Sequence, residues 1–335
     1  MTEFLSDIGI TLFAMLISWE SRVALVYLGA TILIVFLLWL YRGRPETFLR
    51  WALPASVYLH KSNRVDFQVF VFNIVMSVLG LFAVIGFATF MTLQTIATLS
   101  DWFARPDLPA EATLWRSLLA TLIMVLILDF CRYCAHWLHH ENRILWPFHA
   151  LHHSAEVLTP LTSFRVHPVF LLVRDVIYSV GVGIVQGVML FALMGEIDLV
   201  TIGSANAGYV LFNVLGSNLR HSHIWLSYGP VMEHVFISPA QHQIHHSSAP
   251  RHHNKNYGEI FAFWDWMFGT LYVPKEQEIL EFGLADAQGN LIEQPHPTLF
   301  AAIVHPFFDS WHELQAKLKE APKNVEEAPD KVKGA

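Results

Sequence analysis

The sequence has little charge and almost no cysteine. Asp, Glu, Lys and Arg make up only 15% of its 335 residues, and the 21 basic residues are outnumbered by 28 acidic ones and scattered along the chain. Binding to nucleic acid needs a basic patch or stripe, so this class of function is excluded. The two cysteines, Cys131 and Cys134, lack the second pair that a cysteine-rich zinc site requires, and their spacing on a helix favours a packing role.

Two further features are missing from the N-terminal part of the chain. The first 135 residues contain only one histidine, His60, although the chain has 19. Asp7 interrupts the N-terminus and no basic segment precedes the first apolar run, so no cleavable signal peptide is expected. Residues 1–22 are interpreted as an interfacial lead-in to the first membrane helix.

Apolar residues are abundant instead. They make up 54% of the chain, and the mean hydropathy is +0.41, which is too high for an ordinary soluble domain. Because a span takes about 20 apolar residues, the sequence predicts an all-α integral membrane protein with about four to five transmembrane helices and a cytoplasmic helical cap that carries the histidines. The predicted spans are Val23–Tyr41, Phe67–Leu99, about Ser117–Leu128, Val176–Met194 and Leu199–Gly216.

The distribution of basic residues predicts the orientation in the membrane. A basic excess in a short loop marks the cytoplasmic side. The loop after the first span carries such an excess, made up of Arg42, Arg44, Arg50, Lys61 and Arg64. The last two spans form a hairpin, residues 176–216, which crosses the membrane an even number of times. The histidine-rich segments on either side of this hairpin are therefore predicted to meet on the cytoplasmic side.

Fifteen of the 19 histidines lie between His136 and His253, and nine of them form three clusters with helical spacing. The clusters are His136, His139 and His140; His149, His152 and His153; and His242, His245 and His246. Residues three and four apart share one face of a helix, so each cluster directs two or three imidazoles to one point. A single cluster is more often a group of core histidines, but three in one segment predict a metal site.

The residue type leaves the metal open, because imidazole suits zinc, copper, iron and nickel. The number of ligands is more informative. Catalytic zinc normally takes three protein ligands and structural zinc takes four, whereas the clusters offer eight histidines at favoured positions. This supply favours two ions over one.

Six sequence fragments occur in a specific order between Asp129 and Val273. They are YCAHWLHH, WPFHALHHS, FRVHP, LRHSHI, SPAQHQIHHS and NYGEIFAFWDWMFGT. In this order, and with membrane spans between them, they resemble the membrane-bound fatty acid hydroxylase and sterol desaturase superfamily. The resemblance implies a cytoplasm-facing non-haem di-iron centre that uses O2 and two electrons to hydroxylate or desaturate an unactivated C–H bond of a lipid.

Carried over position by position, the resemblance assigns the iron ligands. They are His136, His140, His149, His152, His153, His221, His242, His245 and His246, with His167 matching a histidine of the sterol-like branches. Two positions depart from the family pattern. Trp137 stands where many members have Arg, which is expected to alter packing. His223 stands where Asn or Gly is common, which leaves its role open.

The resemblance also implies a division of the chain. Residues 23–128 are expected to hold the first transmembrane helices and the basic loop, and residues 129–273 the hydroxylase-like catalytic domain. From its composition, the aromatic-rich stretch Asn254–Pro274 is expected to pack beneath the metal site. Residues 274–320 form a C-terminal cytoplasmic region. Residues 321–335 are mostly charged residues, Pro and Ala, a composition that predicts disorder.

Other polar residues are candidates to orient the ligands from outside the metal shell. They are His139, His223, Asp129, Asn218, Asn256 and Asp265, and for the last four a role as helix cap or turn residue is the alternative. The chain has neither a haem-binding module nor a Rossmann glycine pattern. Electrons are therefore expected from a separate protein, such as a cytochrome b5-like protein, a ferredoxin or a reductase.

The primary expectation is thus a membrane monooxygenase that hydroxylates a lipid, with a lipid desaturase as the closest alternative. A metal transporter or sensor is an alternative of another class, but the low charge inside the predicted spans argues against transport. A catalytically inactive scaffold would lack ligands, and all three histidine clusters are intact. The sequence leaves open which lipid is used, which carbon is oxidised and what the oligomeric state is.

Overall fold

The computed structural model describes residues 2–18, 21, 23–80, 86–104, 106, 113–194, 210, 212–286 and 288–320. Over these residues the chain is helical, and β-structure is limited to three isolated bridges. The tail predicted to be disordered, residues 321–335, lies outside the described residues. So do the hairpin turn and most of its second arm, Leu199–Gly216.

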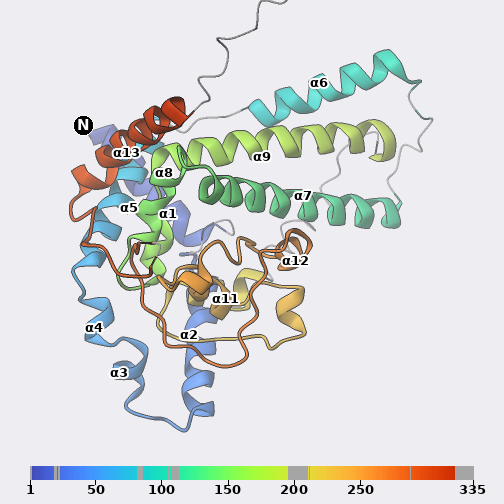
Figure 1. Ribbon diagram of the computed structural model, residues 1–335. Helices are drawn as coiled ribbons and strands as arrows, with labels where there is room; N and C mark the ends of the chain where they lie inside the picture. The colour runs from blue at the N-terminus through green and yellow to red at the C-terminus, as the bar shows by residue number, and fades with distance from the viewer. Residues whose placement is uncertain are drawn as a thin grey trace, which may run out of the picture.

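Three long helices lie side by side in one layer (Figure 1). They are α6 (Phe87–Trp102), α7 (Leu114–Glu141) and α9 (Pro168–Met189), and a short π-helical turn, η2 (Leu190–Met194), continues α9. The segments Leu114–Glu141 and Pro168–Leu193 are long and apolar enough to cross a membrane. Large apolar side chains on both are exposed, among them Leu118, Leu122, Ile184 and Val188. This exposure fits a membrane protein, because lipid covers such side chains.

Small residues bring α9 close to its two neighbours in the layer. A Cβ atom on Gly183 would lie 2.6 Å from Cβ of Met91 in α6, and one on Gly187 would lie 2.6 Å from Cβ of Thr95. On the other side of α9, the Sγ atom of Cys131 in α7 fills the space beside Gly181. Glycines spaced in this way let helix backbones approach each other in membrane proteins. The packing role predicted for Cys131 is thereby confirmed.

The apolar run Phe67–Leu99 does not form the single span that the sequence predicted. It is divided between α5 (Ser62–Val78) and α6, and the two helices point in different directions in Figure 1. Gly80 and Gly86 flank the break, with φ angles of 73° and 87° that favour glycine. Hydropathy does not detect such a break, because the residues around it are uncharged.

The N-terminal helices match the sequence-based expectations more closely. α1 (Thr2–Ile17) covers the predicted lead-in, and α2 (Leu25–Tyr41) covers the predicted first span. The basic loop contains two short helices, α3 (Phe48–Ala52) and α4 (Ala55–Tyr58). α1 packs against α5, next to the end of the three-helix layer from which the histidines project (Figure 1).

The remaining elements lie at that same end of the layer or, in the view of Figure 1, below the layer. α7 is about 42 Å long, longer than the hydrocarbon core of about 30 Å. Its last turns, which carry His136, His139 and His140, therefore extend past its apolar segment. The other helices are α8 (Trp146–His153), α11 (Pro239–His245), α12 (Phe263–Phe268) and α13 (Leu299–Glu320). Short 3-10 helices are η1 (Pro160–Phe164), η3 (Ser217–His221), η4 (Met232–His234) and η5 (Pro250–His252).

We predict that Gly183→Leu separates α6 from α9. The added side chain would collide with Met91 and with the backbone oxygen of Ala88, and overpacking of this kind costs about 1–3 kcal/mol of unfolding free energy. The thermal transition of the purified protein in detergent measures the effect. Gly29→Leu on α2 is the matched control, since a Cβ there meets nothing within 4 Å. Equal transition temperatures for the two variants would contradict this packing.

Candidate metal centre

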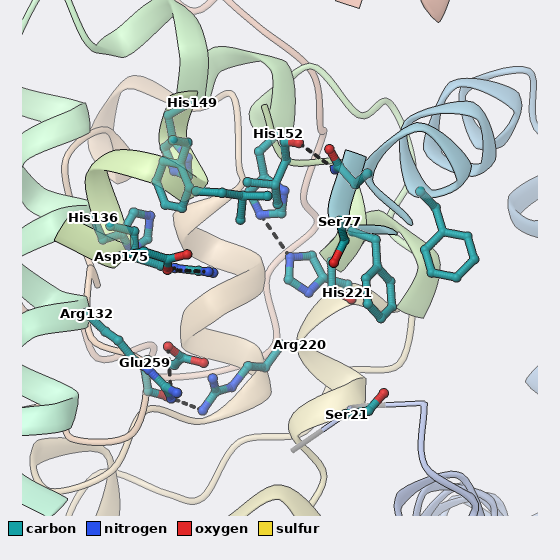
Figure 2. A pocket seen from close by; sticks show the side chains of 18 of the residues that line it. Ser21, Ser77, Arg132, His136, His149, His152, Asp175, Arg220, His221 and Glu259 are labelled. Carbon is teal, nitrogen blue, oxygen red and sulfur yellow. Dashed lines mark hydrogen bonds and ion pairs between the residues drawn. The ribbon is translucent and has the colours of Figure 1, made fainter. Parts of the chain in front are cut away.

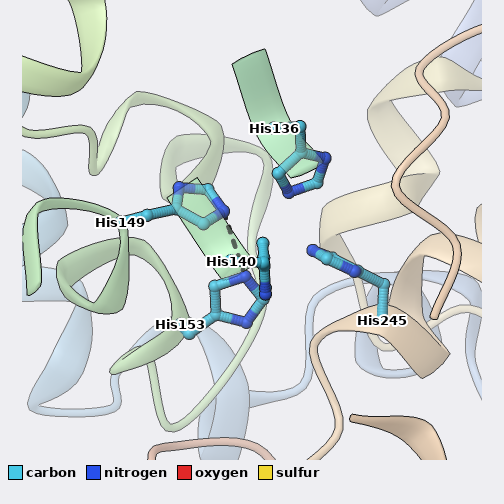
Figure 3. Close-up of side chains that lie close together, drawn as sticks. All are labelled: His136, His140, His149, His153 and His245. Carbon is cyan, nitrogen blue, oxygen red and sulfur yellow. Dashed lines mark hydrogen bonds between the residues drawn. The ribbon is translucent and has the colours of Figure 1, made fainter. Parts of the chain in front are cut away.

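Nine histidines gather in two clusters of buried and half-buried imidazoles. The first cluster consists of His136, His140, His149, His153 and His245; the second consists of His152, His221, His242 and His246. Within each cluster the ring nitrogens that could bind a metal lie within 4.8 Å of one another. Figure 3 shows the five rings of the first cluster turned toward a common point.

The helical period explains how two short helices serve both clusters. On α8, His149 and His153 are four residues apart and join the first cluster, while His152 turns toward the second. On α11 the same spacing sends His242 and His246 to the second cluster and His245 to the first. The rings of His153 and His246 stack with their centroids 4.5 Å apart, so the two clusters are in contact.

Distances in the second cluster match those of a coordination shell. The Nε2 atom of His221 lies 3.2 Å from that of His152, 3.1 Å from that of His246 and 3.1 Å from that of His242. Two nitrogens bound to one ion at about 2.1 Å, with an angle of 90–110° between the bonds, would be about 3.0–3.4 Å apart. The second cluster can therefore accept an ion with little movement of its rings.

The first cluster contains buried nitrogens that need a partner. The Nε2 atoms of His136, His140 and His245 are buried and have no hydrogen-bond partner among the described residues. A buried polar atom without a partner costs about 1–3 kcal/mol. A metal ion between the rings would accept these lone pairs, so the donor set fits a bound cation.

Two backbone carbonyls determine which nitrogen of each ring faces the cluster. The Nδ1–H of His136 donates to the carbonyl oxygen of Tyr257 at 2.8 Å, and that of His245 donates to the carbonyl of Lys255 at 2.7 Å. A proton on Nδ1 leaves the lone pair on Nε2, which is the arrangement commonly found in metal-binding histidines. The segment 255–257 thus orients one ligand from α7 and one from α11.

Burial keeps the imidazoles neutral. It lowers the pKa of His149, His153, His242, His245 and His246 well below the usual value, and the neighbouring imidazoles lower it further. Only the neutral ring has a lone pair to offer a metal. At neutral pH the clusters therefore present ligands that need no deprotonation.

Asp265 and Asn256, which the sequence offered as residues that orient the metal ligands, make specific hydrogen bonds next to the clusters. The Asp265 carboxylate accepts hydrogen bonds from the backbone N–H groups of Tyr257 and Gly258, both at 2.8 Å, and from the Thr270 hydroxyl at 2.6 Å. Burial raises the pKa of Asp265 to about 6, so the carboxylate is ionised at neutral pH. The Asn256 amide donates to the carbonyls of Gln241 and Tyr272. Both residues hold the segment that orients His136 and His245, as expected for a segment packing beneath the site.

Asp129 connects the same region to α7. Its carboxylate accepts from the backbone N–H groups of Ile260 and Phe261, at 2.9 and 3.0 Å, and from Nε1 of Trp264 at 3.0 Å. Asp129 therefore holds the backbone that follows Tyr257 in place. Asn218, another candidate, donates to the Thr31 hydroxyl of α2 at 3.3 Å.

Three of the histidines considered in the sequence lie outside both clusters. His167 caps α9: its Nδ1 accepts from the N–H of Val169, and its Nε2–H donates to the carbonyl of Ile303. Both nitrogens are thus engaged, and the structure does not place His167 among the possible ligands. The Nδ1–H of His139 donates to the carbonyl of Ala135, and the Nε2–H of His223 donates to that of Trp51.

A buried ion pair that sequence reasoning missed supports α8. The Arg165 and Asp66 side chains are fully buried and 3.1 Å apart. Arg165 also donates to the carbonyl of Leu151 at 2.8 Å and to the hydroxyl of Ser154 at 2.7 Å, at the C-terminal end of α8. The one sequence signal was a lone arginine between Phe164 and Val166, which implies a buried partner of opposite charge.

Both clusters border one cavity of about 830 Å³. His136 and His149 of the first cluster line it, together with His152, His221 and His242 of the second. Figure 2 labels four of these histidines, His136, His149, His152 and His221, together with residues of the surrounding wall. A cavity of this size falls within the range of small-molecule sites, about 300–1,000 Å³.

Comparisons with known proteins agree with this site. The sequence profile of the fatty acid hydroxylase family matches residues 121–270, which include all nine clustered histidines. Ornithine lipid hydroxylase OlsE of Rhizobium tropici is 29% identical over 185 residues, 55% of this chain and 51% of the relative. Alkylglycerol monooxygenase of Caenorhabditis elegans is 27% identical over 170 residues, 51% of this chain and 30% of the relative.

The name of a further relative indicates a different reaction. Delta(7)-sterol 5(6)-desaturase ERG3A of Gibberella zeae is 29% identical over 178 residues, 52% of this chain and 44% of the relative. The matched part spans about half the length of the first of these relatives and less of the other two. No solved structure matches the chain significantly.

The helical layer with its two exposed apolar helices points to a membrane protein, and the paired histidine clusters form a candidate metal centre. The comparisons make the class specific. The family match and the named relatives support membership of the fatty acid hydroxylase and sterol desaturase superfamily.

We predict that each cluster binds its own ion. His245→Ala in the first cluster and His152→Ala in the second should each lower the bound metal from two ions per chain toward one, because each removes a nitrogen from a different set. Elemental analysis of the purified protein measures the content. His312→Ala on α13 should retain both ions. Unchanged metal content in either cluster variant would refute the assignment of ligands.

We also predict that Asp265→Asn weakens metal binding without removing a ligand. The amide keeps the shape of the carboxylate but replaces one acceptor oxygen with a donor, so the segment that orients His136 and His245 loosens. The loss of an outer hydrogen-bond partner lowers metal affinity by about 10–100-fold. Titration of the metal-free protein measures this. Asp286→Asn, in an exposed turn, is the matched control and should bind as the parent does.

Proposed function

We propose that this chain is an O2-dependent oxidoreductase that hydroxylates an unactivated C–H bond of a membrane lipid, with one iron ion in each histidine cluster. One observation carries the proposal: two touching clusters, built only of imidazoles, open into a single cavity large enough for part of a lipid. Two ions bound there would share one substrate. A binding or storage protein has no need for such a shared cavity.

The named relatives support the class of substrate. Two are a lipid hydroxylase and a monooxygenase, one is a sterol desaturase, and each is similar to this chain over about half of its length. Their names leave the substrate of this chain open, because the match covers only part of each relative. They favour lipid oxidation over the transporter and sensor alternatives.

The donor set supports iron as the metal. Imidazole is a ligand that suits iron, and five and four histidines supply enough nitrogens for two ions. When bound, an iron pair would supply the O2-dependent redox chemistry that amino-acid side chains do not provide. The electrons would come from a separate donor, such as a cytochrome b5-like protein, a ferredoxin or a reductase, and the site would face the cytoplasm.

The side chains of the protein would act on the substrate by position and exclusion. The walls of the cavity would hold one C–H bond of the lipid next to the histidines. The burial of the histidine rings keeps water away from the reacting atoms, which protects a reactive oxidant from side reactions. His136 and His245 would be held in place by the carbonyls of Tyr257 and Lys255.

Desaturation is a second candidate, favoured by the similarity to the sterol desaturase. Both reactions remove a hydrogen from carbon, and they differ in whether oxygen returns to that carbon. In either case the substrate would occupy the same cavity and lie beside the same two clusters. The product distinguishes the two reactions.

We predict that the iron-loaded protein, supplied with a reductant and isotope-labelled O2, incorporates one labelled oxygen atom into a lipid of the membrane from which it is purified. Mass spectrometry of the extracted lipids measures this. A product that has lost two hydrogens and carries no label would identify a desaturase instead. No change in any lipid under conditions where both irons are bound and reduced would refute an oxidative function.

A further inference from the structure

The cavity below the histidines has one charged wall. Its charged lining residues come from α7, α9, η3 and the loop after Tyr257: Arg132, Arg174, Asp175, Arg220 and Glu259. In Figure 2, Arg132, Asp175, Arg220 and Glu259 lie on the side of the cavity where His136 lies. A charged wall beside a metal centre is unexpected in a cavity that receives only hydrocarbon.

The charges on this wall alternate in sign. Arg132 and Glu259 are 3.4 Å apart, and each side chain is 26% exposed. Arg174 and Asp175 are 2.7 Å apart, with 40% and 32% of their side chains exposed. Arg220 donates to the backbone carbonyl of Glu259. Acidic and basic groups therefore stand next to each other and remain accessible to a ligand.

Stability does not explain these residues. Ion pairs exposed to this extent contribute little to folding. Arg174 and Asp175 also lie within the segment of α9 that is long and apolar enough to cross a membrane. Ionisable residues in such segments are costly, and where they occur they usually mark a functional site.

The opposite wall is uncharged. α1 and the residue that follows it contribute Thr11, Ala14, Met15 and Ser18, and α5 contributes Phe70, Asn73, Ile74 and Ser77. In Figure 2, Ser21 and Ser77 lie on the other side of His152 and His221 from the charged wall. The histidines therefore stand at the boundary between a charged and an uncharged part of the cavity.

We propose that the charged wall binds the head group of a zwitterionic lipid, whose hydrocarbon chain lies along α1 and α5. This inference rests on the proposed function and makes its substrate specific. The carbon below the histidines then lies near the junction of the head group and the chain, and oxidation occurs there. A carbon at the far end of the chain would lie away from the histidines.

The alternating charges select the type of head group. An anionic head group would be repelled by Asp175 and Glu259, and a cationic one by the three arginines. A head group with both signs can pair with both, which is how charge complementarity gives specificity. A sterol offers only a hydroxyl group and carries no charge that complements this wall.

Variants of one pair on α9 test the proposal by the direction of the effect. Asp175→Asn removes a negative charge, so it should shift lipid binding toward an anionic lipid. Arg174→Gln removes a positive charge and should shift it the opposite way, against the anionic lipid. Each shift should be about tenfold, the effect expected for a lost hydrogen bond to a charged group that is partly exposed.

The measurement is a competition between phosphatidylethanolamine and phosphatidylglycerol with identical acyl chains. Native mass spectrometry of the purified, iron-loaded protein gives the ratio of the two lipids that remain bound after the detergent is removed. Arg174→Lys keeps the charge and should keep the parent ratio, with a preference for the zwitterionic lipid. Arg50→Gln on α3, whose side chain is exposed outside the cavity, should also leave the ratio unchanged.

If Arg174 and Asp175 had a purely structural role, both substitutions would shift the ratio of bound lipids in the same direction. This result would overturn the proposal. So would a parent protein without preference between the two lipids. If one variant fails to fold, the direction in which the other variant shifts the lipid ratio decides. Because binding is measured without O2, a correct charge dependence with no lipid oxidation would refute the proposed function alone. Oxidation at a carbon far from the head group would refute the proposed placement.

Discussion

The structure depends on the convergence of nine imidazoles inside the protein. Their ring nitrogens gather in two neighbouring clusters, and in the first cluster three of the Nε2 atoms have no partner among the described residues. Each such nitrogen disfavours the folded state by about 1–3 kcal/mol. A bound cation reverses the sign of this contribution, because it binds the folded arrangement and not the unfolded chain. The surrounding scaffold must hold the rings in place before the ion arrives.

The scaffold does so with few elements. α8 and α11 each contribute two rings to one cluster and one ring to the other, so a small rotation of either helix would disturb both clusters. The segment 255–258 sits between α7 and α11 and holds one histidine of each through a backbone carbonyl. Asp265 and Asp129 fix this segment and the residues that follow it through backbone N–H groups. The rigidity of the site therefore comes from backbone contacts.

Local patterns made part of this arrangement predictable. Histidines three and four residues apart on a helix must share a face, and the position of the segment beneath the site was predicted from its aromatic-rich composition. The distribution of the rings between two clusters was not predictable, since it depends on how α8 and α11 face each other. His167 precedes Pro168, and a residue before a helix-starting proline caps the helix, a signal that competed with the ligand assignment. The break between α5 and α6 depends on two glycine φ angles that hydropathy does not record.

The pair Arg165 and Asp66 shows why a costly contact can be retained beside such a site. A fully buried ion pair adds little net stability, because desolvation offsets the attraction. The Arg165 guanidinium, however, binds the last turn of α8, whose free carbonyl groups need donors. A positive charge at this end also complements the helix dipole. Asp66 belongs to α5, which lines the cavity, so one contact fixes the three histidines of α8 and the uncharged wall relative to each other. An apolar replacement could restore packing but would supply no donor to these carbonyls.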